Sequence, residues 1–207
     1  MAEPTVDPEE QIRRAIDVGV APPFARLIGG IPGPLSIRQG DLLRELAARV
    51  TQGVIVEIGS YRGKSTVALA HGAREGHDVP VYAVDPHESF NGPFGGVFGP
   101  VNRRQFYETM LSTGHWENVR LVNLPSTVVA AGWDRPIGLL WIDGDHHYEA
   151  VRADVESWER HLLPGAPMVL DDTDRGGPQQ VVAELVDSGR WRLGEKRRKV
   201  QVLHRVG

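Results

Sequence analysis

The stretch from Val54 to Thr66, VIVEIGSYRGKST, decides the fold class. It begins with an apolar run interrupted only by Glu57, which is typical of a strand buried on both faces. Gly59 and Gly63 then bracket a tight turn, and a helix is expected from Lys64 onward. A strand, a glycine turn and a helix in direct succession predict the first unit of a largely parallel α/β sheet.

Short apolar runs alternate with amphipathic stretches along the rest of the chain, so the same unit is expected to repeat. We predict strands at residues 54–59, 81–85, 119–123, 137–143 and 166–172, and a closing hairpin from residues 191–195 and 199–206. Helices are expected at residues 8–19, 36–50, 64–74, 148–161 and 179–188, with a Pro/Gly-rich crossing at 21–35. The predicted fold class is α/β, with a Rossmann-like, mostly parallel seven-stranded sheet covered by helices on both faces.

We expect one domain over residues 1–207, with residues 1–50 forming an N-terminal helical region that either covers the ligand site or builds a homodimer. The formal net charge of −4 argues against a nucleic-acid partner. The absence of cysteine leaves only oxygen or imidazole ligands for a metal. The first 20 residues are too polar for a signal peptide and no apolar run is long enough for a membrane helix. A cytoplasmic protein without a membrane partner is therefore expected.

Three known glycine turns compete for the segment that follows the first strand. A dinucleotide-binding turn, G-x-G-x-x-G, lacks its second glycine, because Ser60 and Tyr61 follow Gly59. A phosphate-binding loop needs four residues between its glycines, and only three separate Gly59 from Gly63. The E/D-x-G-x-x-x-G turn, which resembles that of methyltransferases dependent on S-adenosylmethionine (SAM), matches without a gap. SAM carries a sulfonium and an ammonium group, so an acid at Glu57 suits it, and a helix N-terminus suits its carboxylate.

The ends of the next two strands carry further candidates for the cofactor. Asp85 ends the second strand, where an acid can accept both ribose hydroxyls. Ser126 follows the third strand and either meets the adenine edge or simply caps a helix. The expected cofactor-binding residues are Glu57, Gly59, Ser60, Tyr61, Gly63, Ser65, Asp85, Ser126 and Asp143. Residues 86–100, rich in Gly, Pro and Phe, form either a lid or a surface loop.

Three acids are expected to meet at the edge of the sheet where its parallel strands end. Asp143 follows the fourth strand, and Asp171 and Asp172 follow the fifth. Carboxylates gathered in this way need a compensating cation, and a hard ion such as Mg²⁺ prefers oxygen ligands. Two alternatives stay open: the acids cap helices or are solvated, or Asp143 belongs to the nucleotide site of a P-loop-like hydrolase.

The segments VEIGSYRGKST, AVDPHE, LLWIDGDHHYEAVRADVESW and PGAPMVLDDT together resemble the small bacterial sugar O-methyltransferases of the macrocin O-methyltransferase type. The resemblance spans about residues 54–173. It implies methyl transfer from SAM to a sugar hydroxyl, with Mg²⁺ held by Asp143, Asp171 and Asp172 and with Asp145 as general base. His146 follows Asp145 directly here, so the identity of the base stays open between these two residues. A catechol-type acceptor is the alternative within the same chemistry.

Overall fold

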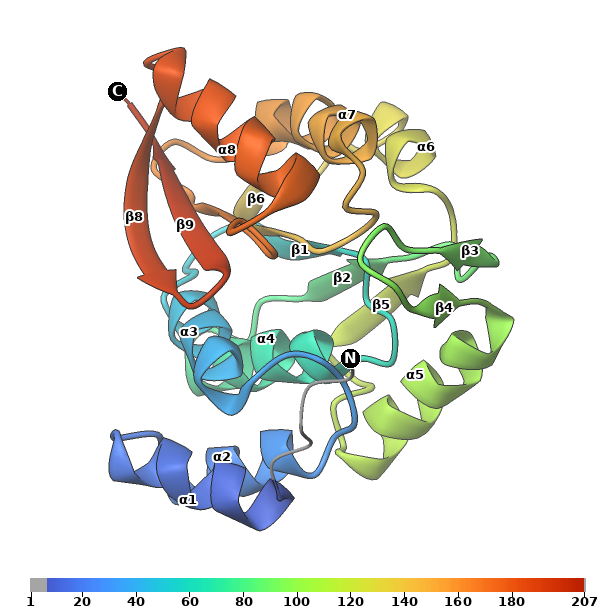
Figure 1. Cartoon of the computed structure of the whole chain (residues 1–207), viewed down its shortest axis with the longest axis vertical. Helices are drawn as coiled ribbons and strands as arrows, with labels where there is room; N and C mark the ends of the chain where they lie inside the picture. The colour runs from blue at the N-terminus through green and yellow to red at the C-terminus, as the bar shows by residue number, and fades with distance from the viewer. Residues whose placement is uncertain (1–6, 207) are drawn as a thin grey trace.

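The computed structural model describes residues 7–206 and contains a seven-stranded sheet with the strand order β5-β2-β1-β6-β7-β9-β8 (Figure 1). Neighbouring strands are parallel from β5 to β7, whereas β9 is antiparallel to both β7 and β8. The predicted fold class is confirmed. The strands are β1 (Val54–Ile58), β2 (Val81–Val84), β5 (Val119–Val122), β6 (Ile137–Ile142), β7 (Met168–Leu170), β8 (Trp191–Arg197) and β9 (Val200–Arg205).

Helices cover both faces of this sheet (Figure 1). One face carries α3 (Ile37–Ala48) and α4 (Lys64–Glu75), and the other carries α6 (Ser126–Ala131), α7 (Tyr148–Trp158) and α8 (Gly176–Asp187). A short 3₁₀-helix, Glu159–His161, continues from α7.

The central strands supply a core to each face because successive side chains of a strand point to opposite sides. In β1, Ile55 packs into the core shared with α3 and α4, while Val56 and Ile58 pack into the core shared with α7 and α8. Trp158 lies fully buried in that second core. The apolar run that indicated a doubly covered strand thus has both of its faces buried.

The N-terminal region is helical from Pro8 onward, and its first six residues lie outside the described part of the chain. It contains α1 (Pro8–Asp17), α2 (Pro22–Gly29) and α3. Ser36 and Gln39 form the capping box that begins α3. The expectation of a plain crossing at residues 21–35 was wrong, because Pro22 stands at the first turn of α2, where its missing N–H costs nothing.

The segment that follows β2 also has more regular structure than a long loop. It contains a small antiparallel hairpin of β3 (Phe90–Asn91) and β4 (Val97–Phe98), and it leads into α5 (Pro100–Ser112), which the sequence pattern did not predict. Phe106 and Met110 anchor α5 to the core. Among the described residues, no helix combines the length and apolar character needed to cross a bilayer.

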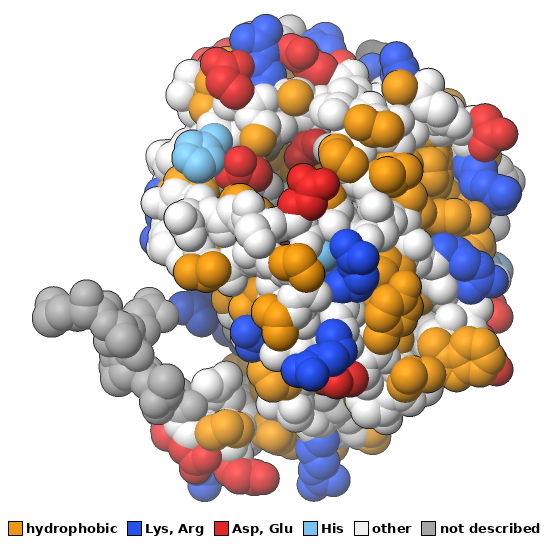
Figure 2. All heavy atoms as spheres, turned by 90° about the vertical axis from the view of Figure 1, so that its right-hand side faces the viewer, with side chains coloured by type: hydrophobic (Ala, Val, Ile, Leu, Met, Phe, Trp, Pro, Cys, Tyr) orange, Lys and Arg blue, Asp and Glu red, His pale blue; other side chains and the backbone are white. Residues whose placement is uncertain are grey.

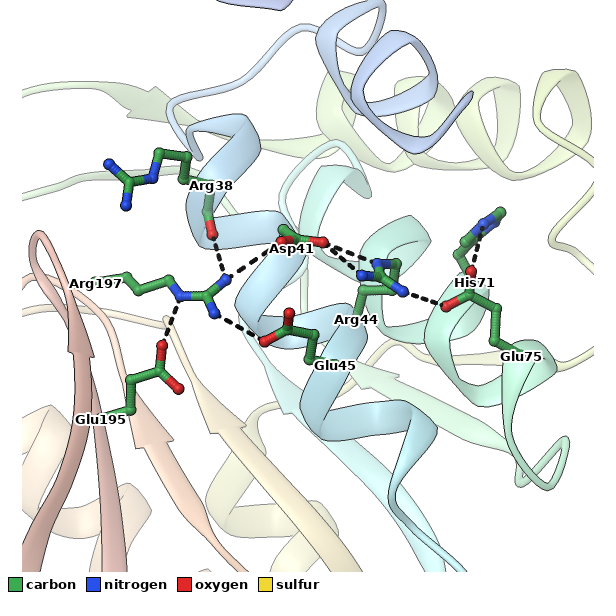
Figure 3. Close-up of polar contacts among 8 residues, drawn as sticks. All are labelled: Arg38, Asp41, Arg44, Glu45, His71, Glu75, Glu195 and Arg197. Carbon is green, nitrogen blue, oxygen red and sulfur yellow. Dashed lines mark hydrogen bonds and ion pairs between the residues drawn. The ribbon is translucent and has the colours of Figure 1, made fainter. Parts of the chain in front are cut away.

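A network of ion pairs fastens the β8–β9 hairpin to α3 and continues from α3 to α4 (Figure 3). The guanidinium of Arg197, near the tip of the hairpin, lies 2.8 Å from Glu45 and 3.4 Å from Asp41. Asp41 also contacts Arg44 at 2.7 Å, and Arg44 reaches Glu75 of α4 at the same distance. Single ion pairs of this exposure stabilise little, but a connected set restricts how the hairpin tip can lie.

Candidate active site

A cavity of about 380 Å³ opens at the carboxyl ends of β1, β2 and β6. Apolar side chains form much of its wall, and the β3–β4 hairpin and α7 complete it. Of the expected cofactor residues, the cavity is lined by Gly59, Tyr61, Asp85, Ser126 and Asp143, whereas Glu57, Ser60, Gly63 and Ser65 lie behind its wall. The face in Figure 2 has a hollow with acidic side chains in and beside it and a histidine at its margin.

The glycine turn between β1 and α4 is tightly packed at both of its glycines. Gly59 has a φ of +82°, and a Cβ there would collide with the carbonyl group of Asp143. Gly63 has a φ of +87°, and its Cβ would lie 2.7 Å from Cε of Met110. The left-handed conformation favours glycine at both positions, and at Gly59 the close approach of two backbone segments requires it as well.

The carboxylate of Asp85 organises this turn. Its Oδ2 accepts hydrogen bonds from the backbone N–H groups of Ser60 at 2.9 Å and Tyr61 at 2.8 Å, and its Oδ1 accepts from the N–H of His87 at 2.8 Å. These bonds join the end of β2 to the turn after β1. Asp85 still lines the cavity, so it is available to a ligand from the opposite side.

His87 supports the same turn, a role that the sequence pattern did not predict. Its buried ring lies with Nε2 2.9 Å from the carbonyl oxygen of Tyr61 and Nδ1 3.3 Å from Nδ2 of Asn123. The amide of Asn123 also donates to the carbonyl oxygen of Asp85 at 2.7 Å. This set of partners suits the tautomer that carries its proton on Nε2. The position of His87 two residues after Asp85, in the segment DPHE, was the available signal.

Glu57 lies beneath the turn and does not reach the cavity. Its fully buried carboxyl group accepts hydrogen bonds from the hydroxyls of Ser65 and Thr66, both at 2.5 Å. Burial raises the pKa of Glu57 to about 8, against the effect of these two hydrogen bonds. The residue therefore holds the first turn of α4 in place, and the idea that its charge faces a sulfonium finds no geometric support.

The far wall of the cavity combines apolar surface with one buried acid. The hydroxyl of Ser126 donates to Oδ1 of Asp154 on α7. Pro125, not Ser126, is the N-cap of α6, so the capping alternative for Ser126 was wrong. Burial raises the pKa of Asp154 to about 6. Asp154 was missed from the sequence because it lies inside a helix, where an acid usually faces solvent.

The structure brings the three predicted acids to one edge of the sheet. The ring of His146 lies between two of them, with Nε2 3.3 Å from Asp143 and Nδ1 3.4 Å from Asp172. Burial lowers the pKa of His146, but the hydrogen bond to Asp143 and the charges of the three acids outweigh it and raise the pKa. Burial and then the charge of Asp143 raise the pKa of Asp171 to about 7. The adjacency of β6 and β7, on which this expectation depended, is thereby confirmed.

Lys199, at the tip of the β8–β9 hairpin, supplies a cation that the sequence pattern did not reveal. Its Nζ lies 2.7 Å from Oδ2 of Asp171 and 3.1 Å from Oδ2 of Asp172. Arg175 contacts the other oxygen of Asp172 at 3.3 Å. Within residues 7–206, no three His, Asp or Glu side chains are arranged to hold a metal ion. Because an ammonium group stands between two of the expected ligands, these residues as placed do not fit Mg²⁺.

The two candidate bases differ in their access to the cavity. Asp145 lines it, and its Oδ1 lies 2.7 Å from Nδ1 of His147. His146 is not part of the wall, and its ring stacks on Phe94 at 5.4 Å. The guanidinium of Arg175 also lies over the Phe94 ring, at 4.2 Å, so the segment after β2 closes over the acids.

Comparison with known proteins assigns the chain to a family. The family described as "Methyltransferase domain" matches residues 56–173, more than half of the chain. Cofactor-bound Rv0187 from MTB is 20% identical, with a TM-score of 0.69 over 98% of each chain. The SAH-bound methyltransferase PaMTH1 of Podospora anserina is 14% identical, with a TM-score of 0.65 over 97% of this chain and 88% of its own.

CalS11, a TDP-rhamnose 3'-O-methyltransferase of calicheamicin biosynthesis, is 19% identical, with a TM-score of 0.60 over 96% of this chain and 95% of its own. At these identities the likeness to solved structures establishes the fold alone, whereas the family match covers the glycine turn and all of the clustered acids. The chain therefore belongs to the methyltransferase domain family.

Proposed function

We propose that this methyltransferase uses SAM to methylate a hydroxyl group of a small acceptor, and that a sugar or short saccharide is the acceptor class. The observation that carries the proposal is one cavity that is lined by the glycine turn, by Asp85 and by Asp143 and Asp145. The same cavity therefore offers groups that suit a nucleoside and an acid that can take a proton.

The chain's own residues divide the cofactor between them. SAM, when bound, supplies a methyl group already activated by its sulfonium. Asp85 would accept the ribose hydroxyls, and Ser126 with Asp154 would face the adenine edge, where a carboxylate can accept from an exocyclic amine. The glycine turn would let the backbone pass close to the ligand, because Gly59 and Tyr61 line the cavity.

Asp145 is the group we assign to the proton of the acceptor hydroxyl. It is the candidate base that lines the cavity, and the imidazole and N–H of His147 hold its Oδ1 at 2.7 and 3.1 Å. Holding the acceptor in line with a methyl donor can contribute roughly 7–11 kcal/mol to lowering the barrier. General-base assistance contributes typically ~10²–10⁴-fold more. His146, paired with Asp143 and Asp172, positions the acids and does not take the proton in this proposal.

Support for a sugar acceptor comes from the entrance. Phe90 and Phe98 line the cavity and stack on each other at 4.6 Å, presenting aromatic surface beside carboxylates that can accept from hydroxyl groups. The fold shared with a sugar-nucleotide methyltransferase is consistent with this class. A catechol-type acceptor would meet the same aromatic surface and is the second candidate. The P-loop-like hydrolase is set aside because the family match is to methyltransferases.

The experiment is an acceptor screen with SAM labelled in its methyl group. Nucleotide sugars, glycosides and catechols are offered in parallel, and Asp145→Asn serves as the matched inactive control. Label transferred to the oxygen of a saccharide, and lost in the variant, is the expected result. Transfer to catechols alone would assign the second candidate, and transfer to nitrogen or carbon would overturn O-methylation.

A further inference from the structure

We infer that Lys199 is the resident cation of the acidic cluster, occupying by its ammonium group the place where a divalent metal would neutralise Asp171 and Asp172. The cluster is then charge-compensated by the chain itself, and methyl transfer does not require Mg²⁺. The statement that methyl transfer does not require Mg²⁺ rests on the proposed function. The position of the ammonium group between the two acids is independent of that function.

One ammonium group contacts both carboxylates directly. Nζ of Lys199 lies 2.7 Å from Asp171 and 3.1 Å from Asp172, so one ammonium group bridges an oxygen of each carboxylate. Both acids are buried, with 3% and 5% of their surface exposed. A buried carboxylate pair is retained only when cations or hydrogen-bond donors compensate it. Lys199 supplies this compensation from a position between the two carboxylates, where a metal ion bound by both would also have to lie.

The backbone around Lys199 fixes the position of this residue. The carbonyl oxygen of Lys199 accepts from both the N–H of Thr173 at 2.9 Å and the hydroxyl of Thr173 at 2.8 Å. Arg198, at the turn of the hairpin, has a φ of +57°, and Arg197 is tied to α3 by its ion pairs. The tip is therefore held on both sides of Lys199, and Thr173, which binds its carbonyl group, directly follows the acids that the lysine contacts.

The cation between the two acids is a lysine and not an arginine. The chain has twenty arginines and three lysines, yet a lysine stands here. An ammonium group is a compact point charge that fits between two carboxylates, whereas a guanidinium is a broad planar fork. Arg175 at 3.3 Å from Asp172 and the ring of His146 complete the neutralisation from outside.

One atom of the cluster shows where a metal would enter if the lysine were removed. Oδ1 of Asp171 is buried and has no hydrogen-bond partner among the described residues. Loss of the ammonium group would remove the lysine contact of both Oδ2 atoms, beside this oxygen that already has no partner. The inference therefore predicts that removal of the side chain creates affinity for a divalent ion.

The test measures metal binding directly, by calorimetric titration of the EDTA-treated protein with MgCl₂ and MnCl₂. Lys199→Ala is compared with the wild type and with Lys196→Ala, which removes an exposed lysine of the same hairpin that forms no ion pair with the acids in the described part of the chain. Thermal unfolding in each salt gives a second readout, and SAM is titrated separately in the same buffers. Failure of the wild type to bind SAM would contradict the proposed function. The metal titrations would still test the inference about Lys199 independently.

We expect the wild type and Lys196→Ala to show no saturable binding of metal at millimolar concentrations. Lys199→Ala should bind the metal with an affinity at least roughly tenfold higher than the limit that these titrations set for the wild type. Lys199→Met, which better preserves the volume of the side chain, should behave like Lys199→Ala and replaces it if the smaller side chain impairs folding. Stoichiometric binding of Mg²⁺ by the wild type, lost in Asp171→Asn and unchanged in Lys199→Ala, would overturn the inference. Activity abolished by EDTA and restored by Mg²⁺ would overturn it as well.

Discussion

Asp85 Oδ2 lies 2.8 Å from the backbone nitrogen of Tyr61, although the two residues follow different strands of the sheet. The same oxygen accepts from Ser60, so the acid that faces the cavity also shapes the turn that the cofactor would meet. Binding and turn geometry are therefore coupled at one carboxylate, and substitutions there test both.

Asp85→Ala should destabilise the fold, because it leaves the N–H groups of Ser60 and Tyr61 without an acceptor. An unsatisfied buried donor costs about 1–3 kcal/mol, and the loss should appear in urea unfolding. Asp85→Asn keeps an acceptor oxygen and should lose less. Asp134→Asn, which changes an exposed acid at the opposite edge of the sheet, is the control and should change stability little. Equal stability of Asp85→Ala and the wild type would contradict this role.

Gly59→Ala should be among the most damaging single-methyl additions in the chain. The new Cβ would meet the backbone of Asp143, which cannot move aside as a flexible side chain can. We expect a loss of roughly 1–3 kcal/mol or more in the free energy of unfolding, as for other overpacked sites. Gly132→Ala is the matched control, since a Cβ added there would have nothing within 4 Å and the φ of Gly132 is −106°. A Gly59→Ala protein as stable as Gly132→Ala would show that the turn is looser than described.

Asp145→Asn should reduce kcat about 10²–10⁴-fold, because the amide cannot accept the proton of the acceptor. His146→Asn should lose less activity and more stability, since His146 pairs two acids and does not line the cavity. Initial rates with the acceptor found in the screen, and unfolding curves of the same samples, separate the two effects. The reverse pattern would assign the base to His146.

The pH dependence of stability should carry the signature of Glu57. Burial raises its pKa from 4.5 to about 8, so the folded protein holds a proton that the unfolded chain releases above about pH 4.5. The resulting stability is present at low pH and is lost as the pH rises towards 8. Glu57→Gln should remove this part of the decline, an effect on the order of a few kcal/mol between pH 5 and 8. Parallel stability profiles of the variant and the wild type would contradict the buried, protonated state.

The elements that the sequence predicted correctly are those whose pattern is local. The run Val54–Ile58 is apolar on both faces because both faces are buried, and the capping box of Ser36 and Gln39 needs only one helical turn. Helix α2 was missed because its two prolines suggested a crossing, although proline suits the first turn of a helix. Helix α5 was missed because only a few of its residues face the core.

The predictable part of the candidate site consists of residues that the order of the parallel strands brings together. Asp143 and Asp171 follow adjacent parallel strands, and that order follows from the fold class. Lys199 reaches the same acids from an antiparallel hairpin whose register no local pattern specifies. Glu57 matched the turn motif, but a motif cannot tell that Ser65 and Thr66 draw its carboxyl group away from the cavity.

The central claim, that this cavity holds SAM through Asp85, is tested most directly by calorimetric titration of the EDTA-treated protein with SAM. We predict one binding event per chain in the wild type and in Asp134→Asn, and an affinity reduced at least about tenfold in Asp85→Ala, because the ribose hydroxyls lose their acceptor. No binding of SAM to the wild type, or equal affinity in Asp85→Ala, would contradict the claim.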